Sequence, residues 1–116
     1  MSNWAMGSEP YPDGSRDLTI TFQNDDSNGQ IVGQLYLKGQ AFHVDGNWAA
    51  AGSIAGRNFS AFSAAGSNQQ DATVYVAAGG TVIGPGTAPQ SITINVERAS
   101  SVDGTQIGWD GLLKPM

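Results

Sequence analysis

The sequence predicts an all-β protein of about eight short antiparallel strands, linked mainly by hairpins and arranged as a meander β-barrel or a β-sandwich. Its composition is unusual, with 16 glycines and only 13% charged residues, whereas helical domains of this size usually carry many more charged side chains. Short segments alternate apolar and polar residues, which is the period of a strand. Turn signals separate these segments at hairpin length.

The domain organisation follows from length and from the first prolines. A chain of 116 residues is expected to form one domain with its own core. Residues 1–17 hold Pro10, Pro12 and the turn sequence PDGS, so we expect an irregular N-terminal arm there. We expect a single all-β domain over residues 18–116.

Alternation is clearest in the first and the seventh of the expected strands. Leu18, Ile20 and Phe22 alternate with threonines, as in a strand with one buried face. A similar alternation runs from residue 91 to residue 97. The expected strands are 18–22, 31–38, 41–44, 47–53, 58–65, 72–78, 90–100 and 106–113.

Two Asp-Gly pairs predict hairpins, because both central residues of a type I′ turn need positive φ. A two-residue turn at residues 103–104 would place Val96 opposite Gly111 and Arg98 opposite Trp109. This register collects the apolar residues of both strands on one face. It would also let Arg98 stack on Trp109.

The second Asp-Gly pair expected to form a hairpin, at residues 45–46, suggests a candidate site. A turn there places His43, the one histidine of the chain, opposite Trp48. With a further hairpin at residues 55–56, Ser63 would lie beside Trp48. An aromatic floor with an imidazole and a hydroxyl could bind a sugar or another small polar ligand, and the alternative is an ordinary cross-strand packing pair. Further aromatic candidates for ligand contact are Tyr75, Trp109 and Phe62.

A polar loop offers a weaker metal-binding hypothesis. Asn24, Asp26 and Asn28 stand at alternate positions before Gly29, which matches the first half of a calcium loop. The twelfth position of that loop is Leu35 rather than a bidentate Glu. The alternative is a turn in which Asx side chains bond their own backbone. We expect no cofactor elsewhere.

Charge and patterning argue against several partners and locations. The net charge is −5, from ten acidic and five basic residues, and the basic residues are scattered singly. Nucleic acids and anionic membranes both attract clustered basic side chains, so we expect neither as a partner. No secretory signal peptide or membrane-spanning run is recognisable. We therefore expect a cytoplasmic protein, with leaderless secretion as the alternative.

Catalysis finds little support in the residue types. Without cysteine there can be no disulfide, thiolate zinc site or cysteine nucleophile. No serine lies in a GxSxG elbow around which a triad with His43 could form. One histidine is too few for a usual zinc centre. We expect that the protein is not an enzyme.

Two functional hypotheses remain. The first is a non-enzymatic binding module that holds a small polar molecule at the aromatic platform. The second is a structural or protein–protein interaction protein, acting through a sheet edge or as a homo-oligomer, because few charges guard strands such as ATVYVAA against pairing with another chain.

Overall fold

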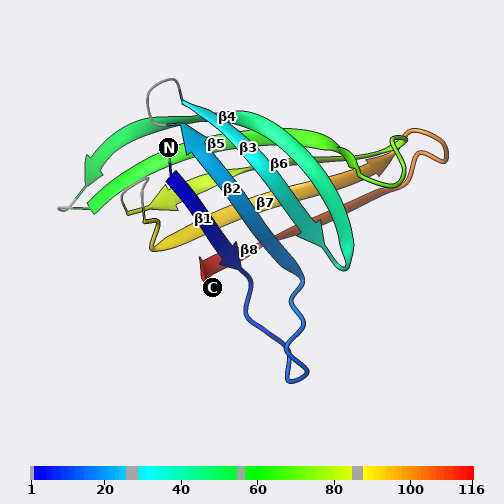
Figure 1. The fold of residues 1–116 in the computed structure, drawn as a ribbon, viewed down its shortest axis with the longest axis horizontal. Coiled ribbons are helices and arrows are strands. Elements are labelled where there is room, and N and C mark those ends of the chain that lie inside the picture. Colours follow the sequence, from blue (N-terminus) through cyan, green and yellow to red (C-terminus); the bar gives the residue numbers. More distant parts are fainter. Residues whose placement is uncertain (1, 26–28, 55–56, 85–87) are drawn as a thin grey trace.

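Eight antiparallel strands form a meander in the computed structural model of this chain, each strand paired with the next along the sequence (Figure 1). The structure describes residues 2–25, 29–54, 57–84 and 88–116. The last strand also pairs with the first, so the sheet closes, and of the two predicted architectures the barrel is confirmed. The strands are β1 (Ser2–Gly7), β2 (Leu18–Asp25), β3 (Gln30–Leu37), β4 (Gln40–Ile54), β5 (Arg57–Asn68), β6 (Val74–Ile83), β7 (Ser91–Ser100) and β8 (Gln106–Pro115).

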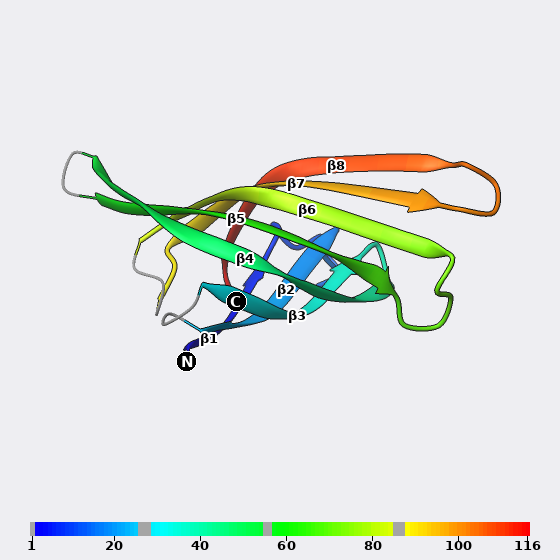
Figure 2. The ribbon, with the colours of Figure 1, turned by 90° about the horizontal axis from the view of Figure 1, so that it is seen from above.

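The barrel is flattened and elongated, with principal extents of 45 × 35 × 21 Å. Seen from above, β6, β7 and β8 lie on one side, and β1, β2 and β3 lie on the other (Figure 2). The hairpin of β7 and β8 extends well beyond the first three strands (Figure 2). Within the described ranges, there is no helix of the length and hydropathy needed to cross a membrane.

The alternating pattern places one face of every strand in the core. Leu18, Ile20 and Phe22 of β2 are at most 2% exposed, while the intervening threonines face outward or lie partly exposed. This is the expected consequence of side chains that alternate between the two faces of a sheet. The buried apolar residues that fill the barrel are Met6, Leu18, Ile20, Phe22, Ile31, Leu35, Leu37, Phe42, Val44, Phe62, Ala64, Val76, Ala78, Val82, Ile92, Ile94, Val96 and Leu113.

The hairpin predicted at Asp45 and Gly46 is wrong, because β4 continues through both residues as one strand of 15 residues. Gly46 faces inward between β3 and β5. A Cβ atom added there would lie 1.8 Å from the carbonyl oxygen of Ser63 and 2.6 Å from the Cα of Ala64. The glycine therefore permits a close approach of two strands rather than a turn.

The irregular arm predicted for residues 1–17 is wrong over its first part. Residues 2–7 form β1, in which Trp4 pairs with Phe22 and Met6 pairs with Ile20. The side chains of Trp4 and Met6 both pack inward, because the two residues stand two positions apart and so share one face of the strand. Eight strands result as expected, but with β1 added and with two expected strands joined as β4.

The hairpin between β7 and β8 exists, but its register differs from the predicted one by two residues. Arg98 pairs with Ile107 and Val96 with Trp109, because the loop contains four residues rather than two. The amide of Gly104 donates to the carbonyl of Ser100 at 3.0 Å. A shift of two leaves each side chain on its predicted face, but it separates Arg98 from the position opposite Trp109.

Three exposed connections share one turn motif, in which an aspartate is followed two residues later by Ser or Thr. In each, one carboxylate oxygen accepts a hydrogen bond from the backbone amide and one from the hydroxyl of that later residue, at 2.6–3.0 Å. These bonds stabilise the ionised carboxylate. The pairs are Asp13 with Ser15, Asp71 with Thr73, and Asp103 with Thr105.

The same bonds lower the pKa of all three carboxyl groups below the ordinary 3.8, mainly through the hydroxyl at Asp13 and Asp71 and through the amide at Asp103. Their stabilisation is complete above the ordinary value and is lost as the pH falls through the lower pKa of the folded state. We expect a D13N/D71N/D103N variant to lose less stability than the wild type between pH 6 and pH 2.5 in urea unfolding. Equal losses would contradict this expectation.

Candidate functional site

A row of polar side chains crosses the outer face of the barrel over five neighbouring strands. The register pairs Gln34 with His43, His43 with Ser67, and Ser67 with Tyr75. Thr21 of β2 pairs with Gln34 and extends the row at its other end. We call these five residues, Thr21, Gln34, His43, Ser67 and Tyr75, the polar row. Because adjacent strands lie about 4.8 Å apart, the row spans about 19 Å.

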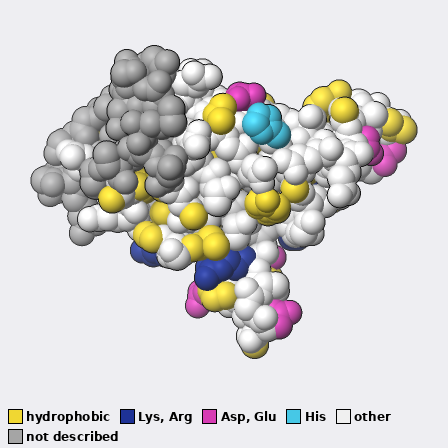
Figure 3. Space-filling view, viewed as in Figure 1, with side chains coloured by type: hydrophobic (Ala, Val, Ile, Leu, Met, Phe, Trp, Pro, Cys, Tyr) yellow, Lys and Arg dark blue, Asp and Glu magenta, His cyan; other side chains and the backbone are white. Residues whose placement is uncertain are grey.

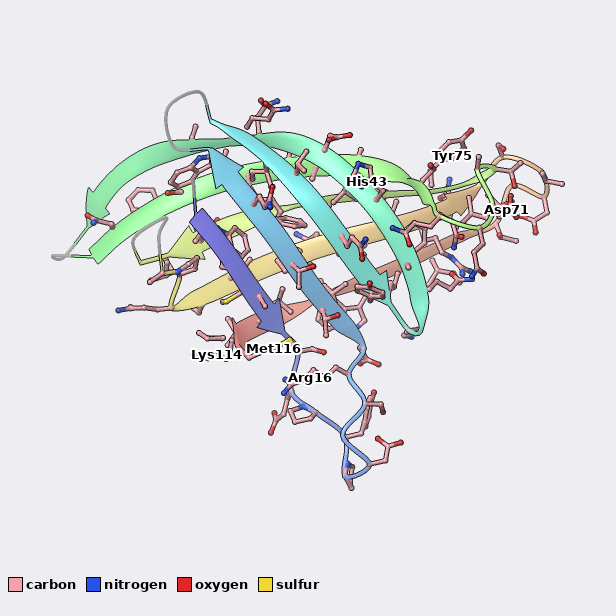
Figure 4. The ribbon with its side chains drawn as sticks, viewed as in Figure 1. Arg16, His43, Asp71, Tyr75, Lys114 and Met116 are labelled. Carbon is pink, nitrogen blue, oxygen red and sulfur yellow. The ribbon has the colours of Figure 1, made fainter. Side chains whose placement is uncertain are left out.

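His43 and the residues at the two ends of the row are exposed to solvent. The His43 side chain is 57% exposed and Tyr75 is 47% exposed, while Gln34 and Ser67 are half-buried. The one histidine stands on the molecular surface (cyan in Figure 3). Figure 4 shows His43 and Tyr75 on the same side of the barrel.

Two shallow hollows border the polar row. The first, of about 620 Å³, is lined by Thr21, Gln34 and His43 beside Val32 and Gly33. The second, of about 540 Å³, lies over β5, β6 and β7. It is lined by Ala65, Gly66, Ser67, Tyr75, Val76, Ala77, Glu97 and Ala99. Both hollows therefore combine small or apolar residues with members of the polar row and with one further polar or charged residue, Gln23 in the first and Glu97 in the second.

Neighbouring polar groups orient two members of the row. The Tyr36 hydroxyl donates a hydrogen bond to Oε1 of Gln34, so the amide group of Gln34 keeps its N–H donors for another partner. Nε2 of His43 lies 3.9 Å from Oδ2 of Asp45, whose side chain is 63% exposed. This separation is longer than a hydrogen bond, and it pairs the two groups electrostatically only when the imidazole is protonated.

The platform predicted from His43, Trp48 and Ser63 does not form. Trp48 faces inward opposite Phe62 and packs against the core, so it lies on the other side of the sheet from His43. Ser63 is exposed, but it pairs with Asn47, four residues along β4 from His43. Phe62 is buried.

Trp109 also faces the inside of the barrel, near one end. It packs against the core, and its Nε1 donates to Oδ2 of Asp17 at 3.3 Å. Arg98, which was expected to stack on it, donates to Oε1 of Gln40 instead. Of the residues predicted to bind a ligand, the structure therefore brings together His43 and Tyr75.

Two features explain why Ser67 and Gln34 were missed. Without a turn at residues 45–46, the partners of His43 come from β3 and from the far half of β5. A bulge between Ala50 and Gly52 then shifts the pairing of β4 with β5 by one residue. The signal for Gln34 was present in the sequence. A two-residue turn at Lys38 and Gly39, both with positive φ, places Gln34 opposite His43 by counting alone.

The metal hypothesis falls largely outside the described part of the chain. Asp26 and Asn28 lie in the segment 26–28, outside the described residues, and of Asn24 only the backbone is described, in β2 paired with Ile31. Among the described residues, no three His, Asp or Glu side chains form a group that could hold a metal ion.

No protein-family description, curated protein or solved structure matches the chain.

Proposed function

We propose that this protein is a non-enzymatic β-barrel binding module that holds a small polar molecule, such as a sugar, on the polar row. One observation carries the proposal. The register lines up an imidazole, a hydroxyl and a phenol on three neighbouring strands, at His43, Ser67 and Tyr75. Each of the two hollows borders this line.

The chemistry of the row suits a ligand with several hydroxyl groups. Imidazole, hydroxyl, phenol and carboxamide groups each offer hydrogen-bond donors or acceptors. A phenol also presents an apolar ring face, against which the C–H groups of a sugar could pack. His43 and Tyr75 are two strands apart, about 10 Å by the usual strand spacing, so one small ligand could reach both.

The packing of the barrel favours an outer site over an inner one. Large side chains such as Phe22, Phe42 and Leu35 fill the interior and are at most 2% exposed. Ligand sites inside β-barrels require a wider lumen than such side chains leave. The exposed outer face is therefore the better candidate for recognition.

The surroundings of His43 favour binding over catalysis. General bases are usually held within hydrogen-bond reach of the group they deprotonate and are tuned by burial. His43 is more than half exposed, and its nearest charged partner is the exposed Asp45 at 3.9 Å. This environment suits a residue that contacts a ligand better than it suits a general base.

The test begins with a thermal-shift panel of sugars and small polar metabolites on the wild-type protein. A ligand at 100 times its Kd should stabilise the fold by about 2.7 kcal/mol, which corresponds to a shift of several degrees. We expect H43A and Y75A each to weaken binding of that ligand at least about tenfold, since each removes one direct contact of about 1.4 kcal/mol or more.

The matched control is T81A, which removes an exposed outward side chain from the same strand as Tyr75, away from the polar row. We expect its affinity to equal that of the wild type. The proposal would be wrong if no compound of the panel shifted the midpoint of thermal unfolding. It would also be wrong if the ligand bound H43A and Y75A as tightly as the wild type.

A further inference from the structure

The closure between β1 and β8 covers only a short part of β8. Met6 pairs with Pro115 and Gly7 with Lys114, and the amide of Met116 donates to the carbonyl of Ala5 at 3.2 Å. From Gln106 to Leu113, β8 has β7 on one side, and within the described residues no strand pairs with its other side. Figure 1 shows β1 ending near the C-terminus while β8 continues toward the far end of the molecule.

The hydrogen-bond pattern identifies the backbone groups along this open edge. Thr105 accepts from the amide of Ser100 on the β7 side, and Met116 donates on the β1 side. Successive residues of a strand direct their N–H and C=O groups to opposite sides. Odd-numbered residues of β8 therefore bond β7, and even-numbered ones face the open side. Those between the loop and the closure are Gln106, Gly108, Asp110 and Leu112.

This edge lacks most of the features that usually keep strand edges apart. Charged side chains, prolines and bulges normally protect exposed edges. Between residues 106 and 112, the only charged residue is Asp110, and there is no proline. Ile107 and Leu112 are 42% and 50% exposed. A Cβ atom added at Gly108 would have nothing within 4 Å.

We propose that the open edge of β8 pairs with the same edge of a second copy of this chain, antiparallel and with the two-fold axis at Gly108. A second copy of the chain is the expected partner because the edge is complementary to itself in this register. In this register Gln106 lies opposite Asp110 of the second copy, so an amide donor faces a carboxylate. On the opposite face of the strand, which is turned toward the inside of the barrel, Ile107 lies opposite Trp109 of the second copy. Each contact occurs twice because the pairing is symmetric.

Charge also selects the register. An axis at Asp110 would place two carboxylates directly opposite each other, which destabilises a strand pair. With the axis at Gly108, residues 106, 108 and 110 of the two copies exchange about six backbone hydrogen bonds. The pairing uses the edge of the sheet and does not require the proposed ligand site.

The first experiment measures mass against concentration by sedimentation equilibrium. A short edge contact is typical of weak, reversible association, so we expect the mass to rise with concentration from 12.0 kDa toward twice that value. G108P removes an amide donor from the open edge and none from the β7 ladder, and we expect loss of the dimer. G108A keeps the donor and should dimerise like the wild type.

A second experiment decides the question even where G108P does not fold. The chain has no cysteine, and directly opposed residues of such a pair lie about 5.5 Å apart between Cα atoms, within disulfide range. Under mild oxidation we expect G108C to form covalent dimers at least about tenfold faster than T93C, because docking raises the local thiol concentration. Thr93 is exposed near the start of β7, one strand removed from the open edge.

A constant monomer mass together with equal cross-linking rates for G108C and T93C would overturn the proposal. Monomeric protein whose edge instead binds an extended segment of a different protein would overturn self-pairing as well.

Discussion

Replacing Gly46 with alanine should lower the free energy of unfolding by about 3 kcal/mol or more, at the upper end of overpacking effects. The added Cβ would lie 1.8 Å from the carbonyl oxygen of Ser63 and 2.6 Å from the Cα of Ala64. Both atoms belong to the backbone of β5, so no side-chain rotation can relieve the contact. The strands β4 and β5 must separate locally, which breaks ladder hydrogen bonds beside the core. Urea unfolding followed by circular dichroism measures the loss.

The matched control is G79A, which adds the same methyl group to a glycine in β6. Its nearest neighbour would be the carbonyl oxygen of Phe62 at 3.4 Å, an ordinary van der Waals distance. An alanine that fits its site reduces the entropy of the unfolded chain and changes stability by less than about 1 kcal/mol. Similar losses for G46A and G79A would mean that crowding at Gly46 is not the cause.

Truncating Phe22 to alanine is the second change with a large expected effect. Phe22 is 2% exposed. The centroid of its ring lies 5.2 Å from the ring centroid of Trp4 and 6.0 Å from that of Phe62. Phenylalanine to alanine changes in protein cores cost about 3–5 kcal/mol, through lost burial and the cavity left behind. We expect the midpoint of thermal unfolding to fall by more than about 10 °C.

T21A is the control for this truncation, because Thr21 precedes Phe22 on β2 and faces the opposite side of the sheet. A surface substitution of this kind should change stability by about 0.5 kcal/mol or less. Near-ultraviolet circular dichroism should show that F22A, and not T21A, alters the signal of the aromatic side chains. A loss below about 1 kcal/mol for F22A would contradict its place at the centre of the core.

The alternation of residue types predicted the faces of the strands better than it predicted their partners. At the hairpin of β7 and β8 the expected register differs from the observed one by two residues, yet Val96 and Trp109 both face inward as expected. Side-chain direction has a period of two residues, so an even shift in register leaves it unchanged. Any shift in register, however, changes which residue lies opposite on the neighbouring strand.

The candidate site shows the consequence of a predicted turn that does not form. The predicted turn at residues 45–46 would have put His43 and Trp48, five residues apart, on one face. In an uninterrupted strand, residues five apart lie on opposite faces, so Trp48 belongs to the core and His43 to the surface. His43 and Tyr75 were both candidates from residue type alone, but their common neighbour Ser67 follows only from the observed pairing.

The sequence by itself determined the fold class and the buried faces of β2, β7 and β8, since alternation along a strand is a local property that survives errors in register. It also indicated the hairpin between β7 and β8. Whether an Asp-Gly pair makes a turn is not local. At residues 103–104 the pair lies in a loop, but at residues 45–46 the glycine is required by the backbone of β5 passing within van der Waals contact. Only the tertiary structure shows that approach, so it alone decided the path of β4 and, through it, which polar side chains meet on the outer face.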